Sequence, residues 1–390
     1  MKRPDRLAVT HVRRIITGDL DHPVAEGNDV LIENGVFSEI GSEVTDADAI
    51  LDAKGLDLWP GLVDSHVHPI VGDVSVMPHG SGWVGEYMNG GVTRMISAGE
   101  LTMPGLTDPL TPEMVVDLAC VTAKLYRGTA MGPKIHAGTL LLVPGLQRSD
   151  FERIAKAGGV CVKYIYYPFA NPDRQELDNY RAWAHGAGLK VKLHCGGTSY
   201  RGGSVTADRA VFEASVPDIA GHLNGGPIPV TDEDARFIVE SGAAFEIIMG
   251  GNLRLARDMV AWADAAGLLG SLLCGTDTPG GSGITPRAML QLVAFLSGTC
   301  KLPPSVAVAA ASGNVTRAHG IEGGTIAIGR PADFLLVGAV RGSGAATAEA
   351  SVASGEIPGI GAVVINGEVR AIPGRLTPPP DELPQMTEVR

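Results

Sequence analysis

The sequence predicts an α/β protein, a (β/α)₈ barrel of the TIM type with a small β-sandwich formed by both chain ends. Three observations lead to this fold class. Short apolar segments alternate with helical patterns through the middle of the chain, polar residues stand at the ends of many of these segments, and both chain ends carry strand and turn signals instead. A doubly wound open sheet is the alternative, but it gives no comparable reason for so many polar strand ends.

The central part of the chain, residues 60–321, contains the predicted barrel strands. Each candidate is short and apolar, and each is followed by a glycine-rich turn. The candidates are 60–69, 91–100, 134–145, 160–168, 190–197, 218–226, 243–251 and 272–281. Amphipathic stretches such as 111–128 and 173–188 lie between them and predict helices. Strand and helix therefore alternate eight times, which is typical of a closed parallel barrel.

The two chain ends predict a second domain. Residues 1–59 and 322–375 contain short alternating segments, and "NGV" and "NGE" place Asn-Gly between strand-like runs, a strong hairpin signal. We expect these two parts to form one β-sandwich beside the barrel. The tail, 376–390, is rich in proline, and we expect it to be an arm or to be disordered.

Composition narrows the class of partner. The chain has 390 residues and a formal net charge of -12, which disfavours binding to nucleic acids or anionic membranes. Its five cysteines are scattered and form no C-x-x-C pair, which fits a reducing compartment. The first residues show no apolar signal core, and no apolar run approaches about 18 residues. We therefore expect a cytoplasmic protein that acts on a small molecule.

The stretch "PGLVDSHVHP", residues 60–69, predicts a metal site. Alternate side chains of a strand share a face, so His66 and His68 point the same way. A surface histidine pair on an edge strand is the alternative reading. The chain has only ten histidines, however, and further polar residues stand at other strand ends. These residues are Lys163, His194, His222 and Asp277. Their recurrence at one end of a barrel favours metal binding.

Longer motifs carry a family resemblance. "PGLVDSHVHP", "KLHCGG", "GHLNGGP", "CGTDTPGG" and "GGTIAIGRPADFLLV" together resemble the amidohydrolase superfamily along the whole chain. Within that superfamily, "MISAGE", "HCGGTS", "SVTAD" and "EIPGI" are similar to the enamidases, which open cyclic amides. The resemblance implies the barrel-plus-sandwich fold, a centre of two divalent metal ions and, as in many relatives, a homotetramer.

The resemblance also implies the ligand set. His66 and His68 would bind one metal together with Asp277, and His194 and His222 would bind the second metal. Enamidases bridge the two metals with a glutamate, but the segment 160–168 contains no carboxylate, and Lys163 is the nearest candidate. In many relatives a lysine at this strand end reacts with carbon dioxide, and the resulting carbamate bridges the metals. If Lys163 is not carboxylated, a site with a single metal ion becomes the alternative.

The implied reaction is hydrolysis of a C–N amide bond in a cyclic molecule. A hydroxide that bridges the metals would attack the carbonyl, and Asp277 would carry the proton to the leaving nitrogen. Zinc is the first choice of metal, with iron or manganese as alternatives. The same site could instead serve a lactone, an imide, an acyclic amide or a mononuclear deamination. A non-catalytic assembly protein is the last alternative, but every expected metal position holds a competent residue.

Substrate contacts are expected in the loops that follow the ligands. Candidates directly after ligands are Thr198, Ser199 and Asn224, for which hydrogen bonding within a turn is the alternative role. Candidates for binding a planar or anionic substrate are Tyr164, Tyr166 and Arg201. Glu246, in the middle of a predicted strand, is expected to support a neighbouring residue rather than to react.

Overall fold

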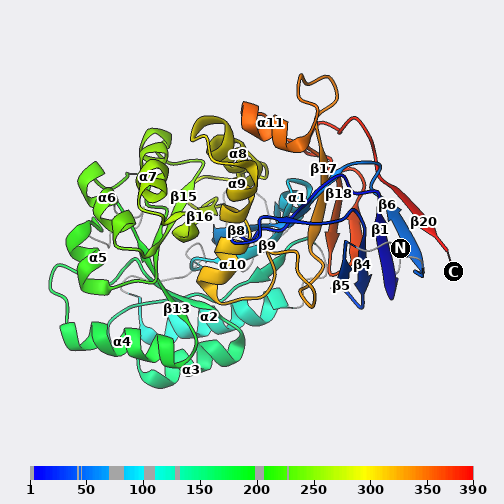
Figure 1. Cartoon of the computed structure of the whole chain (residues 1–390). Coiled ribbons are helices and arrows are strands. Elements are labelled where there is room, and N and C mark those ends of the chain that lie inside the picture. Colours follow the sequence, from blue (N-terminus) through cyan, green and yellow to red (C-terminus); the bar gives the residue numbers. More distant parts are fainter. Residues whose placement is uncertain are drawn as a thin grey trace.

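The computed structural model describes residues 4–41, 44, 46–69, 83–100, 110–127, 132–197, 206–225 and 228–389. The fold is α/β, as predicted. Figure 1 shows parallel strands surrounded by helices in one part of the molecule, and sheets that contain both chain termini in the other part.

The parallel strands form two sheets. Their orders are β10-β9-β8 and β11-β12-β13-β14-β15-β16. The bounds are β8 Leu62–Val67, β9 Val92–Ser97, β10 Lys134–His136, β11 Leu140–Leu141, β12 Cys161–Tyr164, β13 Lys190–His194, β14 Ile219–Gly221, β15 Ala244–Ile248 and β16 Leu272–Gly275. Every strand candidate in the middle of the chain is confirmed. The candidate 134–145 is divided into β10 and β11 because the chain turns at Gly138, which has φ +90°.

The two parallel sheets contact each other at their edges. Beyond the ends of β8 and β16, the amide of Asp277 donates to the carbonyl of His66 over 2.8 Å, and the amide of His68 donates to the carbonyl of Thr278 over 2.7 Å. At the other edges, β10 and β11 follow each other directly along the chain. These contacts bring the carboxyl ends of strands from both sheets close together.

Helices lie between and around the parallel strands. Their bounds are α1 Trp83–Asn89, α2 Pro112–Arg127, α3 Arg148–Ala157, α4 Arg174–Gly186, α5 Arg209–Ser215, α6 Asp232–Glu240, α7 Leu253–Ala265, α8 Ala288–Ala294, α9 Pro304–Ala310, α10 Gly313–His319 and α11 Ala348–Ser354. The helices expected at 111–128 and 173–188 are confirmed as α2 and α4. Asp173 caps the start of α4, because its side chain accepts from the amides of Gln175 and Glu176.

Both chain ends contribute to two further sheets. One has the order β20-β6-β1-β4-β5 and the other β19-β18-β17-β7-β2-β3. The bounds are β1 Arg6–Thr10, β2 Ile15–Ile16, β3 Val24–Ala25, β4 Val30–Glu33, β5 Val36–Ile40, β6 Ala49–Asp52, β7 Asp57–Pro60, β17 Phe334–Gly338, β18 Gly359–Ile365, β19 Glu368–Ala371 and β20 Gln385–Glu388. Phe37 and Phe334 meet in the apolar core that side chains of both sheets share.

The Asn-Gly pairs make the expected hairpin turns. Asn34 and Gly35 join β4 to β5 with φ +50° and +85°, and Asn366 and Gly367 join β18 to β19 with φ +52° and +69°. Positive φ at both central residues is the conformation in which Asn-Gly is favoured.

The end of the chain differs from the expectation of an arm or a disordered tail. Strand β20 pairs antiparallel with β6, from Gln385 opposite Asp52 to Glu388 opposite Ala49. The prolines end at Pro384, so residues 385–388 keep the amide groups that a strand needs. The prediction was wrong for these residues because it treated the whole segment as proline-rich.

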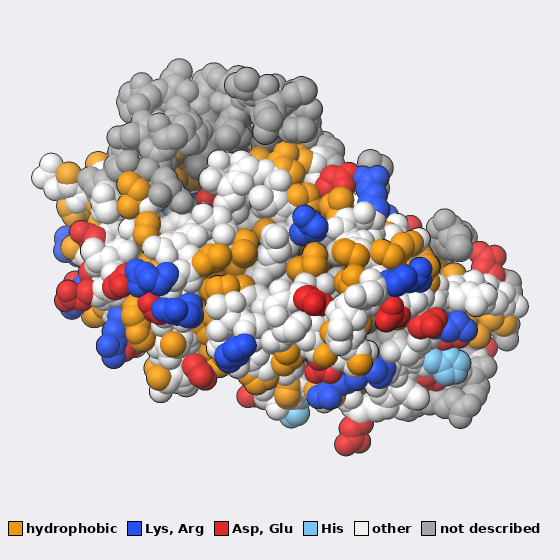
Figure 2. Space-filling view, turned by 90° about the horizontal axis from the view of Figure 1, so that it is seen from above, with side chains coloured by type: hydrophobic (Ala, Val, Ile, Leu, Met, Phe, Trp, Pro, Cys, Tyr) orange, Lys and Arg blue, Asp and Glu red, His pale blue; other side chains and the backbone are white. Residues whose placement is uncertain are grey.

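The surface carries mixed charges. On the face shown in Figure 2, acidic and basic side chains of the described residues are interspersed among apolar ones. Among the helices that the structure describes, none is long and apolar enough to cross a membrane.

Candidate metal centre

The six predicted metal ligands lie at the carboxyl ends of parallel strands. His66 is on β8, and His68 follows that strand directly. Lys163 is on β12, His194 ends β13, His222 follows β14, and Asp277 lies just beyond β16. All six side chains are buried. The structure therefore brings together residues that are spread over more than half of the sequence.

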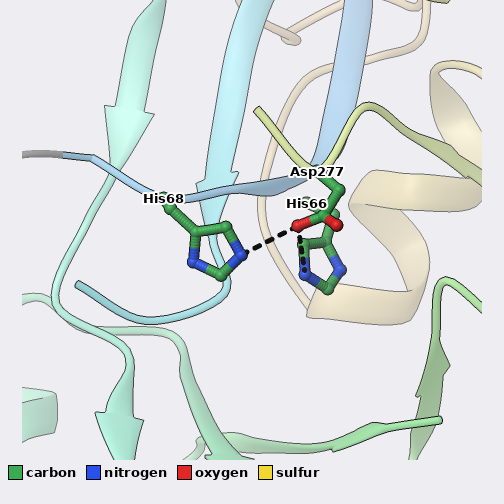
Figure 3. A group of neighbouring side chains, drawn as sticks. All are labelled: His66, His68 and Asp277. Carbon is green, nitrogen blue, oxygen red and sulfur yellow. Dashed lines mark hydrogen bonds and ion pairs between the residues drawn. The ribbon is translucent and has the colours of Figure 1, made fainter. Parts of the chain in front are cut away.

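His66, His68 and Asp277 form one group. Each offers a ligand atom, and these atoms all lie within 4.8 Å of one another. The Oδ1 atom of Asp277 lies 3.0 Å from Nε2 of His68 and 3.6 Å from Nε2 of His66, as the dashed lines in Figure 3 mark. Three donor atoms of this kind are a suitable set for a divalent transition metal.

His194 and His222 form a second group beside the first. Nδ1 of His194 lies 3.0 Å from Nε2 of His222. The ring of His222 is also 4.9 Å from the ring of His66, centroid to centroid, so the two groups are adjacent. Lys163 contacts the first group, because its Nζ lies 2.9 Å from Nε2 of His66.

The hydrogen bonds on the far sides of the rings leave lone pairs facing inward. Nδ1 of His68 lies 2.6 Å from the carbonyl of Gly99, which can only accept, so this nitrogen carries the proton. The other ring nitrogen, Nε2, lies 3.0 Å from the carboxylate of Asp277. A carboxylate only accepts, so this contact holds either a proton of His68 or a metal ion that both residues bind. The arrangement fits a metal ligand set.

The surroundings of the ring nitrogens of His194 and His222 also indicate where a metal could bind. Nε2 of His194 lies 2.8 Å from the carbonyl of Gly197 and donates to it, which leaves a lone pair on Nδ1 toward His222. Nδ1 of His222 is buried and has no hydrogen-bond partner. The unpartnered Nδ1 of His222 is what a bound metal would explain, and Nδ1 of His194 lies beside it, in contact with Nε2 of His222.

Two of these residues have unusual backbone conformations. His222 has φ +30° and Asp277 has φ +56°, a region that residues other than glycine rarely adopt. Gly281 packs so closely that a Cβ there would lie 1.8 Å from Oδ2 of Asp277. Strained backbone at a cluster of polar residues indicates that function, rather than stability, determines the conformation.

The carboxylate of Asp64 joins β8 to the segment that carries Asp277. It accepts from Oγ1 of Thr276 over 2.6 Å, from the amide of Thr276 over 2.9 Å and from the amide of His66 over 3.1 Å. Burial raises the pKa of Asp64 to about 7. Asp64 therefore holds the two ligand-bearing segments together.

Burial also determines the protonation of the ligands. It lowers the pKa of His222 to about 4, and it lowers the pKa values of His66 and His194 well below the ordinary value. The three imidazoles are therefore neutral near pH 7. Burial would raise the pKa of Asp277, but the hydrogen bond that it accepts from His68 acts in the opposite direction, and the pKa is lowered. Asp277 is an anion.

Comparison with known proteins places the chain in a family. It is 35% identical to an enamidase of Eubacterium barkeri over 379 residues, which cover 95% of this chain and 97% of that protein. The profile of the Amidohydrolase family matches residues 227–370. The chain belongs to the amidohydrolase family. It is an enzyme that hydrolyses carbon–nitrogen bonds other than peptide bonds.

Further comparisons cover two solved structures and one shorter sequence match. The crystal structure of an enamidase superposes with a TM-score of 0.89 at 32% identity and covers 98% of this chain and 100% of that one. A β-aspartyl dipeptidase from Fervidobacterium islandicum superposes with a TM-score of 0.68 at 18% identity, over 98% of this chain and 100% of that one, and shares the fold. An Escherichia coli allantoinase is 33% identical over 97 residues, 23% of this chain and 20% of that protein.

The substrate-contact candidates of this amidohydrolase lie in different surroundings. Thr198, Ser199 and Arg201 lie outside the described residues. The side chain of Asn224 bonds to the backbone of Ile248 through both its oxygen and its nitrogen, each over 2.9 Å. These bonds join Asn224 to β15, whereas the alternative role expected for it was hydrogen bonding within its own turn.

The two tyrosine candidates lie on β12 and in the loop that follows it. Tyr164 is fully buried, and its ring packs against Tyr167 and Phe169. Tyr164 directly follows Lys163, so it points to the opposite face of β12, away from the ligands. Tyr166 is half-buried in the loop after β12.

Sequence reasoning missed one residue under this amidohydrolase site. Lys192 is fully buried on β13, two positions before His194, and its Nζ lies 2.8 Å from Oε1 of Glu246. The spacing of two along a strand could have identified it, because it puts Lys192 on the same face as His194. Glu246 supports neighbouring residues, as the sequence predicted, and it contacts His66.

Proposed function

We propose that this amidohydrolase uses two divalent metal ions to hydrolyse the C–N bond of a cyclic amide. The observation that carries the proposal is the buried group of His66, His68 and Asp277, whose ligand atoms all lie within 4.8 Å of one another. The likeness to an enamidase over 97% of that protein's length supports a cyclic amide as the substrate class.

In this proposal the two parallel sheets form one closed (β/α)₈ barrel over residues 60–321. The hydrogen bonds between the ends of β8 and β16, and the direct succession of β10 and β11, support the closure. Residues 1–59 and 322–375 form the β-sandwich, which the mixed origin of its strands and the shared core support. Residues 376–390 extend from it, with β20 attached to β6.

The proposed ligand set has two parts and a bridge. His66, His68 and Asp277 would hold one metal, and His194 and His222 would hold the other, in line with the two adjacent groups. Lys163, as a carbamate, would supply the negative charge between them. Burial lowers the pKa of Lys163 to about 8, although the charge of Asp277 opposes this shift. A larger fraction of this side chain than of an ordinary lysine is thus the neutral amine, which is the form that reacts with carbon dioxide.

When bound, the two metal ions would lower the pKa of a water molecule and polarise the substrate carbonyl. Asp277 then acts as the proton carrier. Its carboxylate is ionised and can accept the proton that water loses, and it returns that proton to the leaving nitrogen as the C–N bond breaks. The ring then opens to an amine and a carboxylic acid. Zinc is the proposed metal, with iron or manganese as the alternatives that the same donor atoms accept.

An assay of purified, metal-loaded protein against a panel of ring compounds tests this function. The panel contains five- and six-membered cyclic amides, cyclic imides, lactones, an acyclic amide and an aminated heterocycle. The proposal expects turnover of a cyclic amide that is lost with a chelator and restored by zinc. Turnover of lactones alone, deamination alone, or turnover that survives the chelator would overturn it.

A further inference from the structure

The carboxylate of Glu246 lies directly beneath the two ligand groups. Glu246 is on β15 and is fully buried. Its Oε2 lies 2.6 Å from Nδ1 of His66 and accepts from the backbone amide of His222 over 3.2 Å. One oxygen atom therefore contacts a residue of each proposed metal site.

The other oxygen, Oε1, has two partners of its own. Nζ of Lys192 donates to it over 2.8 Å, and the hydroxyl of Ser65 donates to it as well. Lys192 also donates to the carbonyl of Ser65 over 2.5 Å. Glu246 thus accepts from four donors, and its negative charge is balanced by a buried cation.

Gly221 leaves room for this arrangement. A Cβ at this position would lie 2.9 Å from the carbonyl oxygen of Leu193, 3.3 Å from Oε2 of Glu246 and 3.3 Å from Cε1 of His66. Any larger residue would press between the carboxylate and the imidazole. The close contact of Glu246 and His66 therefore depends on a glycine at the end of β14.

We propose that Glu246 is a positioning residue for both halves of the metal centre, an inference that rests on the proposed function. A carboxylate can only accept, so it keeps the proton of neutral His66 on Nδ1 and leaves the Nε2 lone pair facing the site. Through the amide of His222 it also holds that residue in its left-handed conformation, φ +30°. The outer nitrogens of His68 and His194 contact backbone carbonyl groups, whereas the outer nitrogen of His66 contacts a carboxylate.

Glu246→Gln tests the inference because an amide cannot satisfy all four donors. If its NH₂ takes the place of Oε1, it faces the ammonium group of Lys192, donor against donor. If it takes the place of Oε2, it faces His66 and forces the proton from Nδ1 to Nε2. Either result disturbs the first ligand group. We expect the affinity for Co²⁺, used as a probe for zinc, to fall by about 10–100-fold.

Two further variants make the test specific. In the double variant Lys192→Met, Glu246→Gln, the cation is gone, so the amide can direct its oxygen to His66 and its NH₂ to Ser65. We expect this variant to regain most of the Co²⁺ affinity, and it also serves if Glu246→Gln alone does not fold. Glu322→Gln, at an exposed position, is the matched control and should bind Co²⁺ like the unaltered protein.

The readouts are Co²⁺ titration, followed by calorimetry and by the absorption spectrum, and ¹⁵N NMR of labelled histidines in metal-free protein. NMR reports which nitrogen of His66 carries the proton. Weaker binding and a changed His66 tautomer in Glu246→Gln, both reversed in the double variant, would support the inference. Unchanged affinity with an unchanged tautomer would overturn it. If the unaltered protein binds no Co²⁺, the proposed function fails, and the His66 tautomer alone then decides the role of Glu246.

Discussion

The amine of Lys163 and the imidazole of His66 face each other across the candidate site, with Nζ 2.9 Å from Nε2. Both side chains are fully buried, and Nδ1 of His66 is bonded to Glu246 on the outer side. The lysine therefore points at the lone pair that His66 would give to a metal. A carbamate on Lys163 would bring an anionic oxygen to this position, where two neighbouring cations need negative charge to offset their repulsion.

Lys163→Ala should abolish activity and reduce the metal content, because it removes the proposed bridge. Acetate or propionate at millimolar concentration should restore part of both by filling the gap with a carboxylate. Lys163→Glu should retain some metal. Elemental analysis and the cyclic-amide assay measure these effects.

Lys156→Ala is the control for the bridge, since Lys156 is exposed on α3 and should affect neither quantity. Full metal content and activity in Lys163→Ala would exclude the bridging role. Electron density for an unmodified amine at Lys163 in metal-loaded, active crystals would exclude the carbamate and favour a mononuclear site.

Asp277→Asn should keep the shape of the site but lose the proton carrier. An amide oxygen can still bind a metal but does not accept a proton, so turnover should fall by roughly two to four orders of magnitude. The rate of ring opening and the metal content are measured together, with the exposed Asp264→Asn as the control. Near-normal turnover in a variant that retains its metal would show that another group carries the proton.

Thr276→Val removes the hydroxyl that donates to Asp64 over 2.6 Å and changes little else. We expect the free energy of unfolding in urea to fall by about 1–3 kcal/mol, since a buried acceptor loses a partner. We also expect weaker metal binding, because Asp277 is the next residue. Thr387→Val, at an exposed position on β20, should leave both unchanged. An effect on stability without any effect on metal affinity would refute the link from Asp64 to Asp277.

Glu100 should make stability depend on pH. Burial raises its pKa from 4.5 to about 7. Between these values the folded state retains a proton that the unfolded state has released, so stability falls as the pH rises through this range and is level above it. The total loss is roughly 3 kcal/mol.

Glu100→Gln cannot ionise, and its amide oxygen can still accept from Ser97 and Gly138, as Oε1 of Glu100 does. Its free energy of unfolding, relative to that of the unaltered protein, should therefore increase from pH 4.5 to about 7 and then remain constant. Urea unfolding at a series of pH values measures this difference. A difference that does not change with pH would show that Glu100 ionises equally in both states.

The strands and the ligands could be predicted because they follow local rules. Alternation and the Asn-Gly signals depend on neighbouring residues, and β8, β12 to β16 and both hairpins lie where the sequence predicted them. The metal ligands stand at strand ends, where the parallel direction brings them together without knowledge of side-chain packing.

Contacts between distant residues were not predictable in the same way. The bonds of Glu246 to Lys192 and Ser65 depend on how β15, β13 and β8 face one another across the strands. The position of Tyr164 among aromatic rings also depends on the register of β12. The pairing of β20 with β6 was missed because an edge partner distant in the sequence decides it.

The number of metal ions that each chain binds tests the central claim most directly. The protein is loaded with zinc, freed of excess metal, and measured by elemental analysis together with His222→Ala. We expect about two ions per chain in the unaltered protein and about one in the variant, because His222 belongs to the second ligand group. A single tightly bound ion in the unaltered protein, or none, would contradict the account.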